Sequence, residues 1–328
     1  MSKPYYLVDI DKDVENKKIR EGFGIGLREA GERDDCVVGL CADLTESTNM
    51  NFFADAFPDR FFEVGIAEQN LVTVASGMAS QGLIPFAASY AAFNPGRNWE
   101  QIRTTAALNE VPVRVVGAHA GISVGPDGAT HQMLEDIAIM RAIPHMLVIA
   151  PADYEEARKA TLALAEDKVN PAYIRLARES VPTVTTTKTP FQIGKAYVYA
   201  SGADVTIVST GTMTYHALKA AHELFVDGVD VEVIHCPTIK PLDAATILTS
   251  IQKTGCVVTA EEHQITGGLG GAIAELVSEH HPVPLKRVGV RDKFGQSGTP
   301  DELMKCYGLT STHIKAAIHE VLIQANKA

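Results

Sequence analysis

Two histidines and an aspartate share one glycine-rich loop near the middle of the chain. His119, Asp127 and His131 lie in the segment HAGISVGPDGATHQ, which directly follows the apolar run 113–118. Its glycines and proline predict an ordered loop with special backbone angles rather than a helix. Histidine has an ordinary pKa of about 6.5 and can move protons near neutral pH, so the loop favours acid–base chemistry over a structural role. Metal binding is a weaker alternative, because the spacing matches no compact set of metal ligands.

Glu68 is a second candidate for chemistry. It stands between the apolar run 61–64, for which we expect a short buried strand, and the run 71–79, for which we expect a helix buried on all sides. In open α/β sheets, ligands bind in the crevice at the carboxyl ends of the strands. Glu68 is therefore either a first-turn acid that faces water and complements the helix dipole, or a desolvated acid or base held over a ligand. Both interpretations stay open from this stretch alone.

Other polar and aromatic groups also follow predicted strands. The cluster 43–48 comes directly after an apolar strand, which favours a site, although a helix N-cap box is the alternative. Tyr90 and Phe93 follow the strand 84–89, and on a helical turn their rings would share a face. Aromatic residues at this spacing are more often core than a platform for a cofactor. Arg178 lies just beyond the end of another predicted strand.

The second half of the chain has its own glycine cluster, at residues 267–271, which leads into a predicted helix. The spacing is not that of a dinucleotide-binding turn, and no acidic residue follows at the distance that a ribose contact requires. We therefore interpret the cluster as a tight turn into a packed helix. The preceding residues 261–263, EEH, could line either an interface or a site.

Strands and helices alternate along the chain, which predicts an α/β architecture with mainly parallel sheets. Residues 181–194, rich in threonine and proline, predict a linker between two domains. The predicted strands are 36–42, 61–64, 84–89, 113–118, 147–150 and 172–176 before this linker, and 205–209, 231–235, 256–260 and 285–290 after it. The predicted helices are 17–33, 71–79, 96–108 and 153–166, then 215–225, 244–253, 269–280 and 311–324.

Composition limits the class of protein. A chain of 328 residues is long enough for two domains of ordinary size. Its formal net charge of −11 and the lack of any basic run argue against a nucleic-acid partner. The polar N-terminus does not resemble a secretory signal, and no apolar run is long enough to span a membrane. The cysteine count of 5, with no C-x-x-C pair, predicts reduced, mostly buried thiols in a cytoplasmic protein.

Several motifs occur together in one order: GLCADLTEST, VGIAEQN, YAAFNPGRNWEQIR, HAGISVGPDGATHQ, EEHQITGGLGGAIAE and VRDKFGQSG. With them, the chain resembles the C-terminal half of a transketolase from about Lys17 to its end. The resemblance implies two doubly wound α/β domains. Residues 1–188 would form the pyrimidine-binding domain for thiamine diphosphate, and residues 189–328 the transketolase C-terminal domain.

The family's other domain is missing from this sequence. That domain carries a G-D-G motif and holds the cofactor diphosphate with Mg²⁺ (or Ca²⁺), and no G-D-G occurs here. The resemblance therefore implies one subunit of a split transketolase, inactive by itself. Its partner would be an N-terminal subunit that holds the diphosphate and the metal, in an α2β2 heterotetramer, and this chain would supply no metal ligand.

Four of the family's cofactor contacts match residues of this chain. Glu68 resembles the glutamate that bonds the pyrimidine ring nitrogen of thiamine and promotes the imino tautomer that activates the cofactor. Tyr90 and Phe93 resemble the aromatic pair against that ring, although phenylalanine is usual at the first position. Asp43 matches an aspartate near the cofactor, and Ser47 a residue near the substrate phosphate.

The substrate contacts match as well. His119 and His131 occupy the spacing of two histidines that bond substrate oxygens and move protons. Asp127 resembles the aspartate that recognises a sugar hydroxyl. Arg20 and Arg178 match two arginines that hold the acceptor phosphate, for which guanidinium is well suited.

The resemblance implies transfer of a two-carbon ketol unit from a ketose phosphate to an aldose phosphate, as in the pentose phosphate pathway. The alternatives are a subunit related to deoxyxylulose-phosphate synthases, a decarboxylase subunit of a 2-oxo-acid dehydrogenase, or a non-catalytic paralogue that binds a partner. His119 discriminates among them, because the synthases usually carry arginine there and the decarboxylase subunits lack the two-histidine loop. Glu46 replaces a residue that is often proline, which questions the local loop shape rather than the chemistry.

Overall fold

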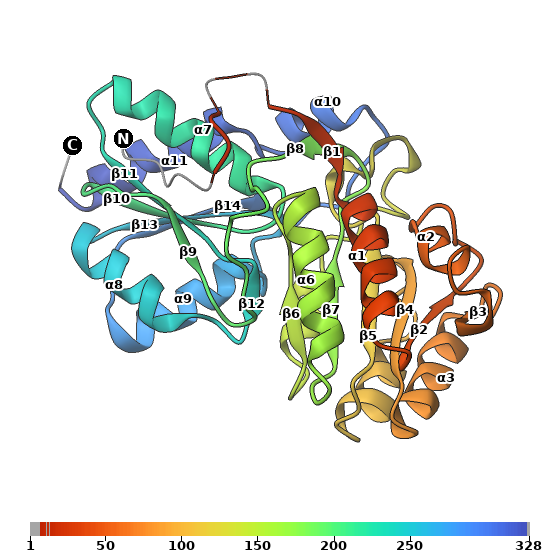
Figure 1. The fold of residues 1–328 in the computed structure, drawn as a ribbon. Helices are drawn as coiled ribbons and strands as arrows, with labels where there is room; N and C mark the ends of the chain where they lie inside the picture. The colour runs from red at the N-terminus through yellow and green to blue at the C-terminus, as the bar shows by residue number, and fades with distance from the viewer. Residues whose placement is uncertain (1–6, 11, 13, 327–328) are drawn as a thin grey trace.

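The computed structural model describes residues 7–10, 12 and 14–326. They form two α/β units side by side, each a sheet with its covering helices, which we call the first and the second layer (Figure 1). The first half of the chain builds one layer and most of the second half builds the other. Both sheets consist mainly of parallel strands with helices between them. The predicted doubly wound α/β class is confirmed.

Within the described residues, the first sheet has the strand order β12-β6-β7-β5-β4-β2-β3. Its strands are β2 (Val37–Cys41), β3 (Phe61–Glu63), β4 (Ile84–Tyr90), β5 (Arg114–Ala118), β6 (Leu147–Ile149), β7 (Ala172–Arg175) and β12 (Thr238–Lys240). All neighbours are parallel except β12, which runs antiparallel to β6. A small antiparallel pair, β1 (Asn16–Lys18) with β8 (Ser180–Pro182), lies outside this sheet.

Helices cover both faces of the first sheet, and one apolar cluster fills each side. They are α1 (Ile19–Arg33), α2 (Asn51–Ala54), α3 (Glu68–Ser80), α4 (Trp99–Gln101), α5 (Asp136–Arg141) and α6 (Tyr154–Glu166), with a π-helix at Ile102–Ala107 and 3₁₀ helices at Pro58–Arg60 and Ile122–Asp127. On one face, α1 packs directly on α6. A Cβ at Gly22 would lie 2.0 Å from the Tyr154 carbonyl oxygen, so the glycines of α1 permit backbone contact.

The second sheet has the order β14-β13-β10-β11-β9 among the described residues. Its strands are β9 (Tyr197–Ala200), β10 (Val205–Ser209), β11 (Val231–His235), β13 (Val257–Gln264) and β14 (Leu285–Val290), and its helices are α7 (Met213–Val226), α8 (Ala244–Thr254), α9 (Leu269–His280), α10 (Pro300–Cys306) and α11 (Ser311–Gln324). Only β9 is antiparallel to its neighbour. None of the helices in the described part of the chain is long and apolar enough to cross a membrane.

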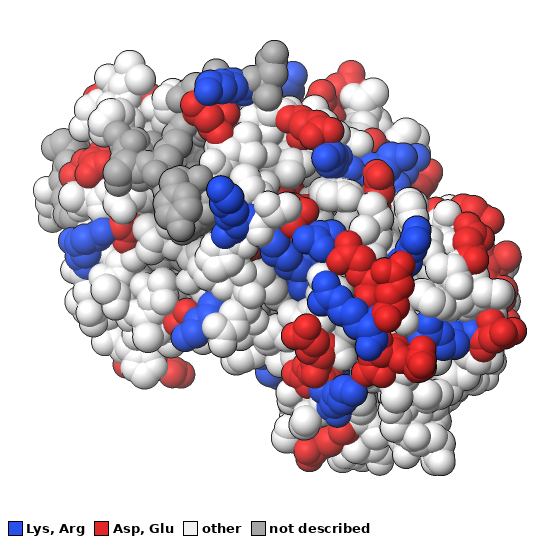
Figure 2. Space-filling model, in the orientation of Figure 1, with Lys and Arg blue, Asp and Glu red and all other residues white. Residues whose placement is uncertain are grey.

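The two layers share a core. Strand β12 comes from the second half of the sequence but completes the edge of the first sheet, where Thr238 pairs with Ile149. One apolar cluster contains residues of both halves, among them Val148, Ile234 and Leu276. On the face shown in Figure 2, basic and acidic side chains lie among each other over the first half. One such pair between helices α1 and α6 is Arg158 with Glu29, at 2.7 Å.

Four details of the predicted elements are wrong. The strand 61–64 is not buried, because β3 lies at the sheet edge with Phe62 38% exposed. Helix α3 buries only one face, and Thr73 and Gly77 are exposed. The helix 96–108 is a short α-turn followed by the π-helix. The loop after β5 contains a 3₁₀ helix, which breaks at Gly125, where φ is +81°.

A buried ion pair ties the first sheet to its covering helix. Arg175 Nε of β7 donates to Asp136 Oδ2 of α5 at 2.7 Å, and Tyr173 Oη donates to the same oxygen at 2.7 Å. Both charged side chains are buried. Arg175 also donates to the Glu262 carbonyl oxygen in the second half at 2.8 Å, so this network helps to fix the two layers together.

Replacing Asp136 by alanine should lower the free energy of unfolding by about 3–5 kcal/mol, because Arg175 then stays buried without a counter-ion. Chemical denaturation followed by circular dichroism measures this change. The control is Asp35→Ala, whose side chain is fully exposed at 102% and whose loss should cost about 0.5 kcal/mol or less. Equal losses in both variants would show that the buried pair does not stabilise the fold.

Candidate active site

The predicted site residues gather at one edge of the first sheet. Strands β2, β3, β4, β5 and β7 are parallel, so their carboxyl ends and the loops that follow them lie at the same edge. The candidates that follow these strands are Asp43 and Ser47 after β2, Glu68 after β3, Tyr90 and Phe93 at β4, His119 after β5 and Arg178 after β7. Arg20 comes from the first turn of α1 and reaches the same edge.

Two aromatic rings and two imidazoles form the centre of this edge. The Tyr90 ring stacks on the His119 ring with centroids 3.8 Å apart, and on Phe93 at 6.1 Å. His131 meets the Phe93 ring edge-on at 5.4 Å. These four residues were predicted separately from two segments of the sequence, and the structure brings them together. We call Tyr90, Phe93, His119 and His131 the ring cluster.

His119 is the most perturbed member of the ring cluster. Its side chain is only 3% exposed, its φ is +55°, and its Nδ1 atom has no hydrogen-bond partner among the described residues. Burial, and then the positive charges of Arg20 and Arg178, lower its pKa to about 2. The imidazole is therefore neutral at physiological pH. A buried nitrogen without a partner is costly, and here it can bond a ligand that enters the site.

Two arginines lie beside this imidazole. Arg20 is 9% exposed and donates to the carbonyl oxygens of Ser47 and, at 2.9 Å, of Arg178. Arg178 in turn donates to the Val124 carbonyl oxygen at 2.7 Å. Arg20 Nε has no partner among the described residues, and burial lowers the pKa of its guanidinium. Two neighbouring cations whose N–H groups are not all hydrogen-bonded favour the binding of an anion.

Glu68 begins α3 and is 5% exposed, so the interpretation as a water-facing first-turn acid is wrong. Both of its carboxylate oxygens accept from Arg97 Nη1 at 3.1 Å. The Arg97 guanidinium also lies 4.1 Å from the centre of the Phe93 ring, which joins Glu68 to the ring cluster. The amide of Asn98 donates to the Glu68 carbonyl oxygen at 2.8 Å and fixes the start of the helix.

Arg97 and Asn98 were missed by the sequence interpretation. Both lie in the quoted motif YAAFNPGRNWEQIR, but no local pattern links them to a carboxylate about 30 positions earlier in the sequence. Only the fold brings the turn after β4 against the start of α3. The available signal was an arginine and an asparagine in the same motif, shortly after Tyr90 and Phe93.

Asp43 and Asp127 are both exposed, and neither side chain bonds to the ring cluster or to the two arginines within the described part of the chain. Asp43 has a φ of +59°, and its N–H donates to Glu63 Oε1 at 2.7 Å. The turn 43–48 is not a helix N-cap box, because α2 starts only at Asn51 and has no side-chain cap. The turn reaches the site through the Ser47 carbonyl oxygen, which accepts from Arg20.

The histidine loop is anchored by the second layer. Gln132, buried within the loop, donates from Nε2 to the carbonyl oxygens of Ile122 at 3.1 Å and of Gln296 at 2.9 Å. The Glu262 carboxylate accepts from the Ser123 N–H at 2.7 Å and from Thr212 Oγ1 at 2.8 Å. Glu262 therefore lies at the interface between the layers. Of the two alternatives for residues 261–263, an interface or a site, the interface holds for Glu262.

The glycine turn 267–271 is a helix start, as predicted. Gly267 has a φ of +77°, and α9 begins at Leu269. The buried Glu261 carboxylate accepts from the N–H groups of Leu269 at 2.7 Å and Gly270 at 2.8 Å. Because Glu261 already occupies these two N–H groups, they are not free to bind a phosphate.

In comparisons with known proteins, the two halves of the chain match two different family models. Residues 15–184 match the family model described as transketolase, pyrimidine binding domain, and residues 194–314 match transketolase, C-terminal domain. A Methanocaldococcus jannaschii protein whose name describes a transketolase C-terminal section is 44% identical over 93% of this chain and 96% of its own. A Clostridium protein named 6-deoxy-6-sulfo-D-fructose transketolase subunit is 41% identical over 95% and 97%.

A solved structure described as a split gene transketolase, inactive beta4 tetramer, superposes on this chain with a TM-score of 0.88. The two sequences are 44% identical, and the match covers 93% of this chain and 98% of the other.

His119 should make the protein less stable in acid. The folded state keeps this imidazole neutral, whereas the unfolded state takes up a proton below about pH 6.5. The unfolded state therefore binds more protons over the range from about pH 6.5 down to 2, and stability falls as the pH falls through it. His119→Gln should reduce this slope by up to about 1.4 kcal/mol per pH unit. Denaturant unfolding at several pH values on both sides of pH ~6.5 measures the slope, and unchanged slopes would contradict the neutral assignment.

Proposed function

The chain belongs to the transketolase family, and from this premise we propose that it is the C-terminal subunit of a split transketolase. With its partner, it would transfer a two-carbon ketol unit from a ketose phosphate to an aldose phosphate. The observation that carries this proposal is the ring cluster. Its His119 is neutral, buried and beside two arginines, and its Phe93 is joined through Arg97 to the acid that starts α3.

Thiamine diphosphate, the family's cofactor, fits the groups that this chain presents. A pyrimidine ring requires an acid for its ring nitrogen and an aromatic surface for its face, and Glu68 with Phe93 and Tyr90 supplies both. When bound, the cofactor supplies the electron sink for cleavage of a carbon–carbon bond next to a carbonyl. The described residues contain no group of three metal-binding side chains, and we assign the diphosphate and Mg²⁺ to the partner subunit.

Glu68 would hold a hydrogen bond to the ring nitrogen, and its burial would strengthen that bond. In the free chain its carboxylate is bonded to Arg97, whose side chain is 50% exposed. Each carboxylate oxygen can accept more than one hydrogen bond, so a ring nitrogen could bond to Glu68 beside Arg97 or displace part of this contact. Half exposure gives the guanidinium room to move while it stays over the Phe93 ring.

The remaining residues would act on the sugar. His119, neutral and with a free Nδ1, can donate or accept a hydrogen bond at a substrate hydroxyl or carbonyl oxygen. His131 is placed to share this role and to move a proton there. Asp127 would recognise a further hydroxyl, and Asp43 would lie near the cofactor. Arg20 and Arg178, with Ser47 beside them, would hold the anionic end of the substrate.

We also propose the assembly with an N-terminal subunit, as an α2β2 heterotetramer. The related structure is described as an inactive tetramer of β chains, which agrees with a chain that needs another subunit for activity.

Glu68→Gln should abolish ketol transfer by the complex without unfolding the chain, because glutamine cannot supply the acid that the ring nitrogen requires. Transfer between xylulose 5-phosphate and ribose 5-phosphate is assayed with the co-expressed partner, thiamine diphosphate and Mg²⁺. Cofactor binding is followed separately by circular dichroism. The control Glu100→Gln, at an exposed acid on α4, should keep activity. Normal turnover by Glu68→Gln would disprove the activating role, and no transfer by the intact complex would disprove the substrate assignment.

Arg178→Gln should discriminate between anionic and neutral substrates. The loss of one charge-assisted hydrogen bond costs about 1.5–3 kcal/mol, so kcat/KM for ribose 5-phosphate should fall by about 10- to 150-fold. The value for the uncharged acceptor glycolaldehyde should change little, and Lys188→Gln, at an exposed lysine, should change neither. A 6-sulfo sugar should respond as the phosphate does, since the Clostridium relative is named for such a substrate. Equal losses for all acceptors would remove Arg178 from anion binding.

A further inference from the structure

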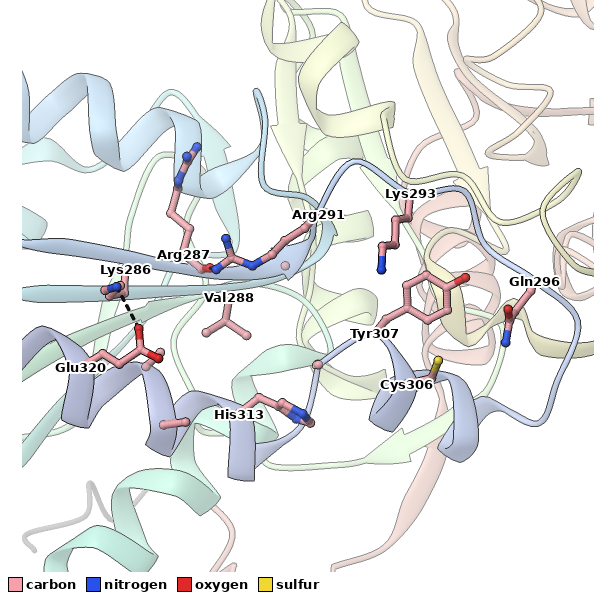
Figure 3. A pocket seen from close by; sticks show the side chains of 14 residues that line it. Lys286, Arg287, Val288, Arg291, Lys293, Gln296, Cys306, Tyr307, His313 and Glu320 are labelled. Atoms are coloured by element: carbon pink, nitrogen blue, oxygen red, sulfur yellow. Dashed lines mark hydrogen bonds and ion pairs between the residues drawn. The ribbon is translucent and has the colours of Figure 1, made fainter.

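A pocket of about 530 Å³ opens in the second layer, among residues to which the proposed reaction gives no role. It lies between the edge strand β14, the segment that follows this strand, and helices α10 and α11 (Figure 3). The volume falls in the range of about 300–1,000 Å³ that is typical of sites for small molecules. We call it the β14 pocket.

The β14 pocket is basic in a protein whose formal net charge is −11. Four cationic side chains line it, Lys286, Arg287, Arg291 and Lys293, against one carboxylate, Glu320. Lys286 pairs with Glu320 at 2.8 Å, and this contact lowers the pKa of the carboxyl group. Within the described residues, Arg287 and Lys293 have no carboxylate partner, and Arg291 is attracted to the same Glu320 carboxylate, so positive charge is left over.

The cationic side chains of the pocket lie beside two rings that hydrogen bonds hold in place, those of Tyr307 and His313. Figure 3 shows Lys293 extending toward the Tyr307 ring and Arg291 lying along β14. Tyr307 Oη donates to the Phe294 carbonyl oxygen at 2.9 Å, which fixes the ring. His313 Nδ1 bonds to Thr310 Oγ1 at 2.8 Å, so the ring is oriented and its Nε2 is free for a ligand. His313 lies in the first turn of the 14-residue helix α11, where the dipole also favours a negative charge.

We propose that the β14 pocket binds a small phosphorylated metabolite through its phosphate group, which would contact Arg291, Lys293 and His313. Two cations and a free imidazole nitrogen suit a dianion with several oxygens better than a single carboxylate. The concave shape and the overall negative charge of the chain favour a small ligand over a nucleic acid. The rest of the metabolite would lie against the Tyr307 ring and the Gly308 backbone.

Cys306 provides a reporter at the pocket. It is exposed and lines the pocket, whereas Cys36 is half-buried in the first layer and serves as an internal reference. The complete chain is alkylated with iodoacetamide, and the rate at each cysteine is followed by peptide mass spectrometry. The probes are inorganic phosphate and glycerol 3-phosphate, with potassium chloride at matched ionic strength as the blank.

Both probes should slow alkylation of Cys306 and leave Cys36 unchanged. A bound ligand slows the reaction by a factor of about 1 + [L]/Kd, roughly tenfold at nine times the Kd. In the double variant Arg291→Gln/Lys293→Gln this protection should disappear, whereas Lys219→Gln, at an exposed lysine on α7, should keep it. The ratio of rates with and without probe is compared within each variant, because the substitutions also change the reactivity of the thiol.

Three results would overturn the proposal. The first is no protection of Cys306 by either probe, and the second is full protection in the double variant. The third is protection by inorganic phosphate but not by glycerol 3-phosphate, which would show that the pocket has no room for an esterified metabolite. The alkylation results do not depend on turnover, so all three can be interpreted whatever the outcome of the Glu68→Gln experiment.

Discussion

The site depends on the removal of ionisable groups from water at the end of a parallel sheet. Arg20, Glu68 and His119 are all buried, although each would be better solvated outside the protein. The cost is offset by rigid surroundings: backbone carbonyls hold Arg20, Arg97 bonds Glu68, and the Tyr90 ring stacks on His119. Burial also keeps the imidazole neutral, so one ring nitrogen can donate a hydrogen bond while the other accepts one.

The second layer holds the histidine loop of the site in place. The loop that carries both histidines has little regular structure of its own, and glycines interrupt it. Its shape comes from contacts with the second layer, chiefly Gln132 to the Gln296 carbonyl and Glu262 to the Ser123 N–H. A buried carboxylate with two donors is a directional anchor. The second layer therefore has a structural role in the site even though it supplies none of the predicted site residues.

Much of the fold could be predicted from sequence, because strands buried on both faces, such as 113–118, read as continuous apolar runs. That the candidate site residues gather at one edge of the sheet was predictable from the clusters at strand ends. Other features depend on distant pairing: nothing near Glu68 indicates Arg97, which follows it by 29 residues. The exposed face of α3 was missed because its small residues, Gly77 among them, fit either a packed or an open surface. Strand β12 was missed because three residues ending in lysine before a proline read as a loop.

Strand β12 also decides where this chain can be divided. The natural place to cut would be the segment between the two sheets, near residues 184–194. A cut there would separate β6 from the strand that covers its edge and would divide one apolar cluster between two fragments. Each fragment would then expose an unpaired sheet edge or core surface, which promotes aggregation. The two layers thus share a sheet edge and part of a core, and a fragment made to study the first layer must carry β12 with it.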